Sequence, residues 1–126
     1  MGESRGTYQP IQGGERSFGG AFLAGVNLSG VDLSGIILRG ANLRFANLRE
    51  ANLTSADLSE ADLYEANLQG AVLRKADLSG ASLWLAEPLN AHLEDANLQD
   101  AKVARAQLTR AASLAGAILP DGTVHE

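Results

Sequence analysis

Several features that would indicate chemistry or a membrane are missing from this chain of 126 residues. It has no cysteine, which excludes disulfides, thiolate metal sites and cysteine nucleophiles. No stretch approaches the roughly 20 apolar residues of a membrane-spanning helix. Residues 1–10 are polar and predict no signal peptide, and Gly6 stands where a myristoylation signal has serine or threonine. We therefore expect a cytoplasmic protein with no membrane association.

What the chain has in abundance is one five-residue unit. From Leu23 to Leu108, every fifth residue is leucine in 16 of 18 cases, and only Pro88 and Val103 replace it. Alanine stands two residues before this position in 15 of 18 cases. A repeat this regular predicts units that stack, each in contact only with its neighbours.

A period of five fits neither regular element of secondary structure. In an α-helix five residues advance by about 500°, so successive leucines would spiral around every side. In a straight strand they would point alternately to opposite faces. Alanine and leucine lie two residues apart, however, as they do on one face of a short extended segment. The pattern predicts a coil that turns a corner every five residues, with alanine and leucine inside and the other three positions in solvent.

Three units show the motif most clearly: residues 41–45, 56–60 and 66–70 read ANLRF, ADLSE and ANLQG. They closely resemble the pentapeptide repeat family, and the resemblance covers about residues 16–119. It implies an all-β solenoid, a right-handed quadrilateral β-helix with four units per coil and about five coils. The ending ILPDGT, residues 118–123, also resembles the terminus of many cyanobacterial members.

The repeat divides the chain into three parts. Residues 1–15 contain four glycines and a proline and predict a flexible N-terminal lead. Residues 16–119 form the pentapeptide repeat β-helix. Residues 120–126 form a C-terminal tail, which begins with the turn-forming sequence Pro-Asp-Gly.

A few positions depart from the repeat. The bulky residues Val26, Val31 and Ile36 replace alanine near the start and predict a tapered or capping coil. Pro88 cannot donate a ladder hydrogen bond, so its side should be dented without becoming a loop. At Ala111-Ala112 the frame slips by one residue. A one-residue bulge and a short capping helix across residues 109–115 are both open interpretations of that slip.

If four units make a coil, residues twenty apart lie one above another. One corner then gathers large side chains that the repeat does not need. Together with Leu89 on the next side, it gives a candidate interaction patch of Arg44, Phe45, Tyr64, Trp84, Leu85 and Leu89. One interpretation is that these side chains pack on one another, with Arg44 over Tyr64 as a cation–π contact. The other is a surface for self-association or for an unknown protein partner.

Charge is otherwise spread over the coil. Residues 16–119 contain 11 acids and 9 bases, and stacked pairs such as Arg74 with Glu94 and Lys75 with Asp95 predict solvated salt bridges. No group of lysines and arginines dominates a side, so we expect no nucleic-acid partner.

The acidic residues of one side form a short candidate strip of Asp57, Glu60, Asp62, Asp77 and Asp100. Such a strip matters because some members of the family resemble duplex DNA in shape and charge and bind type II topoisomerases such as DNA gyrase. A long acidic face would suit a DNA mimic, but this strip is short and basic residues interrupt its surroundings. A DNA-mimicking protein is therefore the alternative function.

The sequence offers no candidate active site. His92 falls at an outward repeat position and His125 in the tail, and neither has a set of metal ligands in its column. The Asp and Asn residues before leucine can bond nearby backbone at the corners. An interior filled by alanine and leucine leaves no ligand cavity. We expect no enzyme, no cofactor, no metal and no small-molecule substrate, and interpret the chain as a non-catalytic rigid solenoid that presents a surface for protein–protein interaction.

Overall fold

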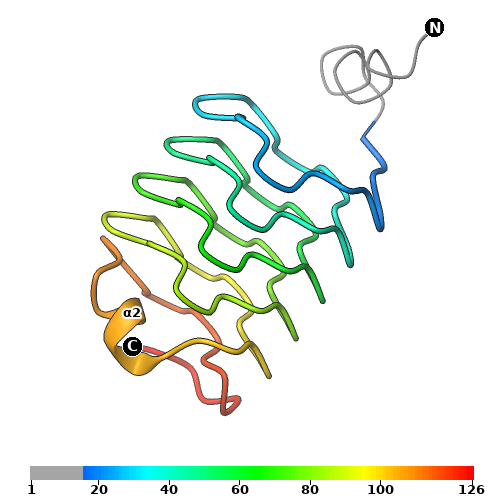
Figure 1. Ribbon diagram of the computed structural model, residues 1–126. Helices are drawn as coiled ribbons and strands as arrows, with labels where there is room; N and C mark the ends of the chain where they lie inside the picture. Colours follow the sequence, from blue (N-terminus) through cyan, green and yellow to red (C-terminus); the bar gives the residue numbers. More distant parts are fainter. Residues whose placement is uncertain (1–15) are drawn as a thin grey trace, which may run out of the picture.

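The computed structural model describes residues 16–126, which wind into a stack of four-sided coils (Figure 1). Parallel bridges join residues twenty apart, from Ser17–Ile37 to Ser82–Lys102. Because each side is one unit of five residues, twenty residues make four sides. We number the sides in chain order, so that residues 16–20 belong to the first side and residues 31–35 to the fourth, and the numbering repeats in each following coil. The column that starts at Ser17 rises through five coils to Ile118. The predicted right-handed quadrilateral β-helix of about five coils is confirmed, whereas the predicted lead, residues 1–15, lies outside the described residues.

The sides are held together by single-residue bridges and not by long strands. The helix α2 (Arg105–Leu108) is the one helix within residues 16–126, and it lies at the C-terminal end of the stack (Figure 1). Past α2, the last bridge is antiparallel and joins Ile118 to Val124. This return of the tail covers part of the last ladder edge, which would otherwise offer unpaired backbone groups.

The interior is a column of alternating alanine and leucine, as predicted. Ala41, Leu43, Ala51 and Leu53 have no exposed surface at all. Burial of each leucine contributes about 1.5–3 kcal/mol, so the column is the main source of stability. Val26 and Val31 are only partly buried, because they belong to the first coil that the structure describes.

A tight turn closes every corner. The carbonyl oxygen of Leu43 accepts a hydrogen bond from the backbone N–H of Ala46 at 3.0 Å, and Phe45 between them has a φ of 63°. A positive φ at the second central residue alone is typical of a type II turn. The Asn42 side chain accepts a hydrogen bond from the backbone N–H of Arg44 at 3.1 Å. Because the same contact recurs around the coil, the predicted role of the Asn and Asp residues is confirmed.

The register shift occurs at α2. Before the helix, ladder partners are twenty residues apart (Ser82–Lys102); after it they are 21 apart (His92–Ser113). The shift is already present at Arg110, whose carbonyl oxygen accepts from the Asn90 N–H at 2.9 Å, one residue later than the repeat requires. The slip therefore arises upstream of Ala111-Ala112. Neither expected form is correct, because the chain uses the extra residue in one helical turn that ends before residue 109.

Gln107 replaces the ladder contacts that α2 removes. Its side-chain amide nitrogen donates to the carbonyl oxygens of Leu83 at 2.7 Å and Ala86 at 2.9 Å. Its side-chain oxygen accepts from the Ala104 N–H at 2.8 Å. Without Gln107 the Ala104 N–H and the Ala86 carbonyl oxygen would lack a partner, whereas the Leu83 carbonyl oxygen also accepts the turn bond of the Ala86 N–H at 3.0 Å.

Pro88 lies one coil before α2, at the place where the helix interrupts the ladder. In a regular coil its N–H would donate to the residue that is now inside α2, so the missing donor removes no ladder bond. Pro88 is buried, and its carbonyl oxygen still accepts from Ala91 at 2.9 Å. A cavity of about 20 Å³ lies beside it in the leucine column. The five-residue frame is preserved around Pro88, as expected. The distortion lies in the next coil, at α2, and not on the side that contains Pro88.

We predict that Gly80→Ala destabilises the protein more than Gly40→Ala. Both glycines have a φ of +69°, so an alanine costs about 1–2 kcal/mol at either position. A Cβ at Gly80 would also have to displace the carboxylate of Glu60, the end of an exposed flexible side chain, which adds a small cost, whereas a Cβ at Gly40 would meet nothing within 4 Å. Urea unfolding of both variants checks the difference, and Glu60→Ala should remove it.

We also predict that Gln107→Ala lowers the free energy of unfolding by about 1–3 kcal/mol, the usual cost of unpaired buried polar groups. Gln99→Ala, on an exposed part of the first side, is the matched control and should have little effect. Equal effects of the two substitutions in denaturant unfolding would contradict the role assigned to Gln107.

Candidate interaction surface

The second side of each coil carries most of the exposed apolar surface. We define this side, the aromatic side, by residues 21–25, 41–45, 61–65, 81–85 and 101–105. Within residues 16–126, six large hydrophobic side chains are exposed, and four of them belong to this side. The six, with their exposed fractions, are Phe22 75%, Ile37 42%, Phe45 54%, Trp84 50%, Leu85 65% and Val124 58%.

The ladder stacks these residues in the predicted columns. The Phe45 N–H donates to the carbonyl oxygen of Tyr64 at 2.8 Å, and the Glu65 N–H donates to that of Trp84 at 3.0 Å. Successive residues of each column are therefore one coil apart, about 4.8 Å. The corner thus brings together residues that are twenty apart in sequence.

Side chains in the N-terminal half of this corner contact one another. The Arg44 guanidinium carbon lies 4.7 Å from the centre of the Tyr64 ring, which confirms the predicted cation–π contact. The Phe45 and Tyr64 rings meet edge to face, with centres 5.6 Å apart. Arg44 Nε also pairs with Asp62 Oδ2 at 3.0 Å. Internal packing therefore explains this half of the patch.

The large side chains in the C-terminal half of the corner are exposed to solvent. Trp84 and Leu85 remain half or more exposed although they follow Tyr64 and Glu65 directly in the ladder. Leu89 lies on the next side and is half-buried, and its N–H donates to Glu87 Oε2 at 3.1 Å. The patch is therefore centred on Trp84 and Leu85.

Phe22 was not among the predicted patch residues. It bridges to Asn42 on the aromatic side and is 75% exposed. The sequence did contain a signal, because Phe22 occupies a position that elsewhere holds mostly Asn or Asp. The rest of its unit is regular, so one unusual residue between alanine and leucine was a weak signal.

Phe45 and Leu85 occupy the corner position of their units, where ten non-glycine residues in all adopt a positive φ. Their φ values are 63° and 59°, in the left-handed region, where glycine is the favoured residue. Gly25 takes the same conformation one coil before Phe45. A non-glycine residue there costs about 1–2 kcal/mol relative to glycine, a cost that Phe45 and Leu85 share with the other eight non-glycine corner residues.

The predicted acidic strip wraps a corner and does not form a long face. Asp57 and Asp77 are ladder neighbours on the first side, and each carboxylate accepts from the serine two residues later. Glu60 and Asp100 lie at the corner beside them, and Asp62 lies on the aromatic side, paired with Arg44. Arg39 enters the strip by donating to the Ser59 hydroxyl at 2.8 Å. The structure thus divides the strip between two sides.

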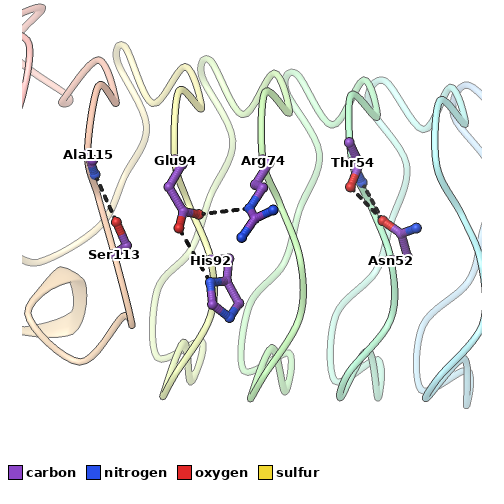
Figure 2. A network of polar contacts seen from close by, with 7 residues as sticks. All are labelled: Asn52, Thr54, Arg74, His92, Glu94, Ser113 and Ala115. Atoms are coloured by element: carbon purple, nitrogen blue, oxygen red, sulfur yellow. Dashed lines mark hydrogen bonds and ion pairs between the residues drawn. The ribbon is translucent and has the colours of Figure 1, made fainter.

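The fourth side carries a small polar network (Figure 2). Glu94 receives Arg74 Nε at 3.4 Å on one oxygen and His92 Nδ1 at 3.5 Å on the other. The predicted Arg74–Glu94 pair is confirmed, whereas residues 16–126 show no ion pair between Lys75 and Asp95. Burial raises the pKa of Glu94, but its backbone hydrogen bond, His92 and Arg74 outweigh burial and leave the pKa below its ordinary value.

A family model described as pentapeptide repeats matches eight copies of the unit, over residues 16–44 and 46–84. The chain belongs to the pentapeptide repeat family. A comparison with curated proteins gave no match.

Solved structures of pentapeptide repeat proteins resemble this one. One from the Arabidopsis thaliana thylakoid lumen is 30% identical, covering 86% of this chain and 72% of that one, with a TM-score of 0.51. One from the cyanobacterium Nostoc is 40% identical, covering 75% and 78%, with a TM-score of 0.41. The plasmid-mediated fluoroquinolone resistance protein QnrB1 is 19% identical, covering 79% and 60%, with a TM-score of 0.47.

The described residues of this pentapeptide repeat protein lack both metal-ligand clusters and membrane-spanning helices. Residues 16–126 contain no group of three or more His, Cys, Asp or Glu side chains that could hold a metal ion. The helix in that part of the chain is too short to cross a membrane. His92 has one acidic neighbour, Glu94, and His125 lines an open hollow of about 240 Å³ at the C-terminal end.

The network on the fourth side gives a pH prediction. Because the pKa of Glu94 is lowered by folding, the ionised carboxylate stabilises the protein above its ordinary pKa, and this contribution is lost as the pH falls through the folded pKa. The pair is partly exposed, so the effect is about a few tenths of a kcal/mol. When the pH falls from 7 to 3, the free energy of unfolding measured with urea should decrease slightly more for the unaltered protein than for the Glu94→Gln variant. An equal decrease for the two proteins would contradict the prediction.

Proposed function

We propose that this protein is a non-catalytic rigid solenoid that binds another protein through the aromatic side. The observation that carries the proposal is the concentration of exposed Phe22, Phe45, Trp84 and Leu85 on one side of four. Contiguous apolar surface on a soluble protein is typical of interfaces, and aromatic side chains dominate interface energetics.

Rigidity supports such a role. Each coil is bonded to the next on its sides and is filled by leucine without exposed surface, as at Leu43, Leu53 and Leu63. A preformed surface binds without the entropic cost of ordering loops. The corner residues around Trp84 are therefore already placed for a partner.

The outward polar residues support a structural role over a catalytic one. Carboxylates that recur along the coil, such as Asp57 and Asp77, accept hydrogen bonds from the turn that follows each of them. They lie on an open side, and the core beneath them is filled by leucine. A reaction would need convergent groups around a cleft that excludes water.

The alternative, a DNA mimic that binds a type II topoisomerase, would need a long acidic face. The acidic strip of this chain is divided between two sides, and within it Asp62 is paired with Arg44 at 3.0 Å. The similarity to QnrB1 is a similarity of fold. Protein binding through the aromatic side is therefore the better-supported function.

We predict that substitution of Trp84 and Leu85 abolishes partner binding without loss of the fold. The double variant Trp84→Ala, Leu85→Ser should lose any protein that the unaltered chain retains from native cytosol, because it removes the most exposed apolar pair. Ile37→Ser, which removes an exposed apolar side chain from the first side, is the matched control and should retain the partner. Equal retention by both variants would refute the proposal.

We also predict that the protein does not inhibit DNA gyrase. In a supercoiling assay at concentrations up to tens of micromolar, gyrase activity should stay unchanged, because residues 16–126 present no long acidic face. Inhibition that disappears in Asp57→Asn, Asp77→Asn but persists in the Trp84 and Leu85 variant would favour the alternative function.

A further inference from the structure

The aromatic side is also distinguished by its charge. Although the whole chain has a net charge of −5, this side carries an excess of positive charge. Its charged residues are the bases Arg44, Lys102 and Arg105 and the acids Asp62 and Glu65. The neighbouring first side instead carries the bases Arg16 and Arg39 and the acids Asp57, Glu60, Asp77, Asp100 and Asp121. On the remaining two sides of the described coils, acids equal or outnumber bases.

Two of these bases follow the most exposed apolar residues. Lys102 bridges directly to Ser82 and is exposed, and Arg105 begins α2 one coil after Leu85. In residues 16–126 neither base takes part in an ion pair. Arg105 and Asp121 both line the hollow at the C-terminal end, so Lys102 is the less compensated of the two. Trp84 and Leu85 therefore have cationic neighbours on their C-terminal side.

We propose that the partner contacts this surface through a segment that is both apolar and acidic. An apolar side chain of the segment covers Trp84 and Leu85, and carboxylates beside it face Lys102 and Arg105. The inference rests on the proposed function, since it specifies the partner of the same surface. Complementary charge adds selectivity and association rate to the affinity that apolar contact supplies.

A second copy of this chain fits the surface less well. About a twofold axis, antiparallel solenoids would oppose Glu65 with Glu65, and parallel solenoids would oppose Lys102 with Arg105. Each arrangement places like charges in contact. The side is also only five coils long, about 20 Å at strand spacing, and a stable interface needs about 800 Å² from each partner. An acidic segment avoids the like-charge contacts.

Trp84 is the one tryptophan of the chain, so its fluorescence reports on this surface directly. The test uses two synthetic ten-residue peptides without tryptophan. Both carry two adjacent leucines in the middle; one has four flanking glutamates and the other four flanking lysines. We expect the glutamate peptide to shift the Trp84 emission to shorter wavelength and to bind at least tenfold more tightly than the lysine peptide. The preference should weaken as salt is raised, because exposed charges are screened.

Charge reversal provides the decisive comparison. Lys102→Glu, Arg105→Glu should reverse the preference in favour of the lysine peptide. Arg74→Glu, Lys75→Glu places the same change on the fourth side and should leave the preference unaltered. Circular dichroism and the melting temperature of each variant establish that the coil is intact.

Three results would overturn the inference: equal binding of both peptides, no change in emission with either, or a charge reversal without effect. A doubled solution mass that the Trp84 and Leu85 substitutions abolish would also overturn it, in favour of a second copy as occupant. The proposed function fails separately, if those substitutions leave partner retention from cytosol unchanged. The two experiments can also give different answers. If retention of a cytosolic protein depends on Trp84 but the two peptides bind equally, the proposed protein-binding function is supported and only the acidic character of the partner is refuted.

Discussion

The whole structure depends on one residue in each unit that adopts a left-handed backbone conformation. Because this residue turns the chain at every fifth position, the next alanine and leucine again point inward and the ladder partner falls twenty residues later. Glycine takes this position throughout the first coil, at Gly20, Gly25, Gly30 and Gly35, where it costs no strain. Ten non-glycine residues take it later in the stack, and the buried leucine column offsets their strain. The corner is thus both the source of the fold and the place where the fold tolerates variation.

This division explains where functional information is located. Two of the five positions in a unit are committed to the core, and the Asn or Asp between them is committed to the turn that follows, as Asp57 is to Ser59. Only the side chains at the two corner positions are free of structural duty. Trp84 and Leu85 occupy both corner positions of one unit with large apolar side chains, where serine and glycine stand at Ser79 and Gly80. A surface of this kind can change its partner without altering the core.

The regular part of the molecule could be predicted from the sequence because every contact in it repeats. The interior follows from spacing, and the four sides follow from the resemblance to pentapeptide repeats. Given four sides, the column of Tyr64 and Trp84 and the contacts of Arg44 with Tyr64 and Arg74 with Glu94 follow from the twenty-residue spacing. The position of helix α2 could not be predicted in this way. Ala106 and Leu108 keep the alanine–leucine frame, although the backbone there forms a helical turn with a different hydrogen-bond pattern. The role of Gln107 depends on that departure, so it too was hidden. Phe22 was missed because one substitution in an otherwise regular unit carries little signal. The division of the acidic strip depends on which sides the corners separate, and on a pairing of Asp62 that a map of columns does not show.

The helix also connects the candidate surface to the least regular part of the ladder. Elsewhere the residue at this corner donates to the coil above, as Phe45 does to Tyr64 and Glu65 does to Trp84. At Leu85 the corresponding acceptor, the carbonyl oxygen of Ala104, instead accepts from Gln107 and Leu108 within α2. Within the described coils, ladder bonding is therefore weakest next to the most exposed apolar pair, where Gln107 maintains the connection to Leu83 and Ala86. Local opening costs least where such bonds are fewest. Trp84 and Leu85 thus lie between a regular ladder in the coil before them and an interrupted ladder in the coil after them.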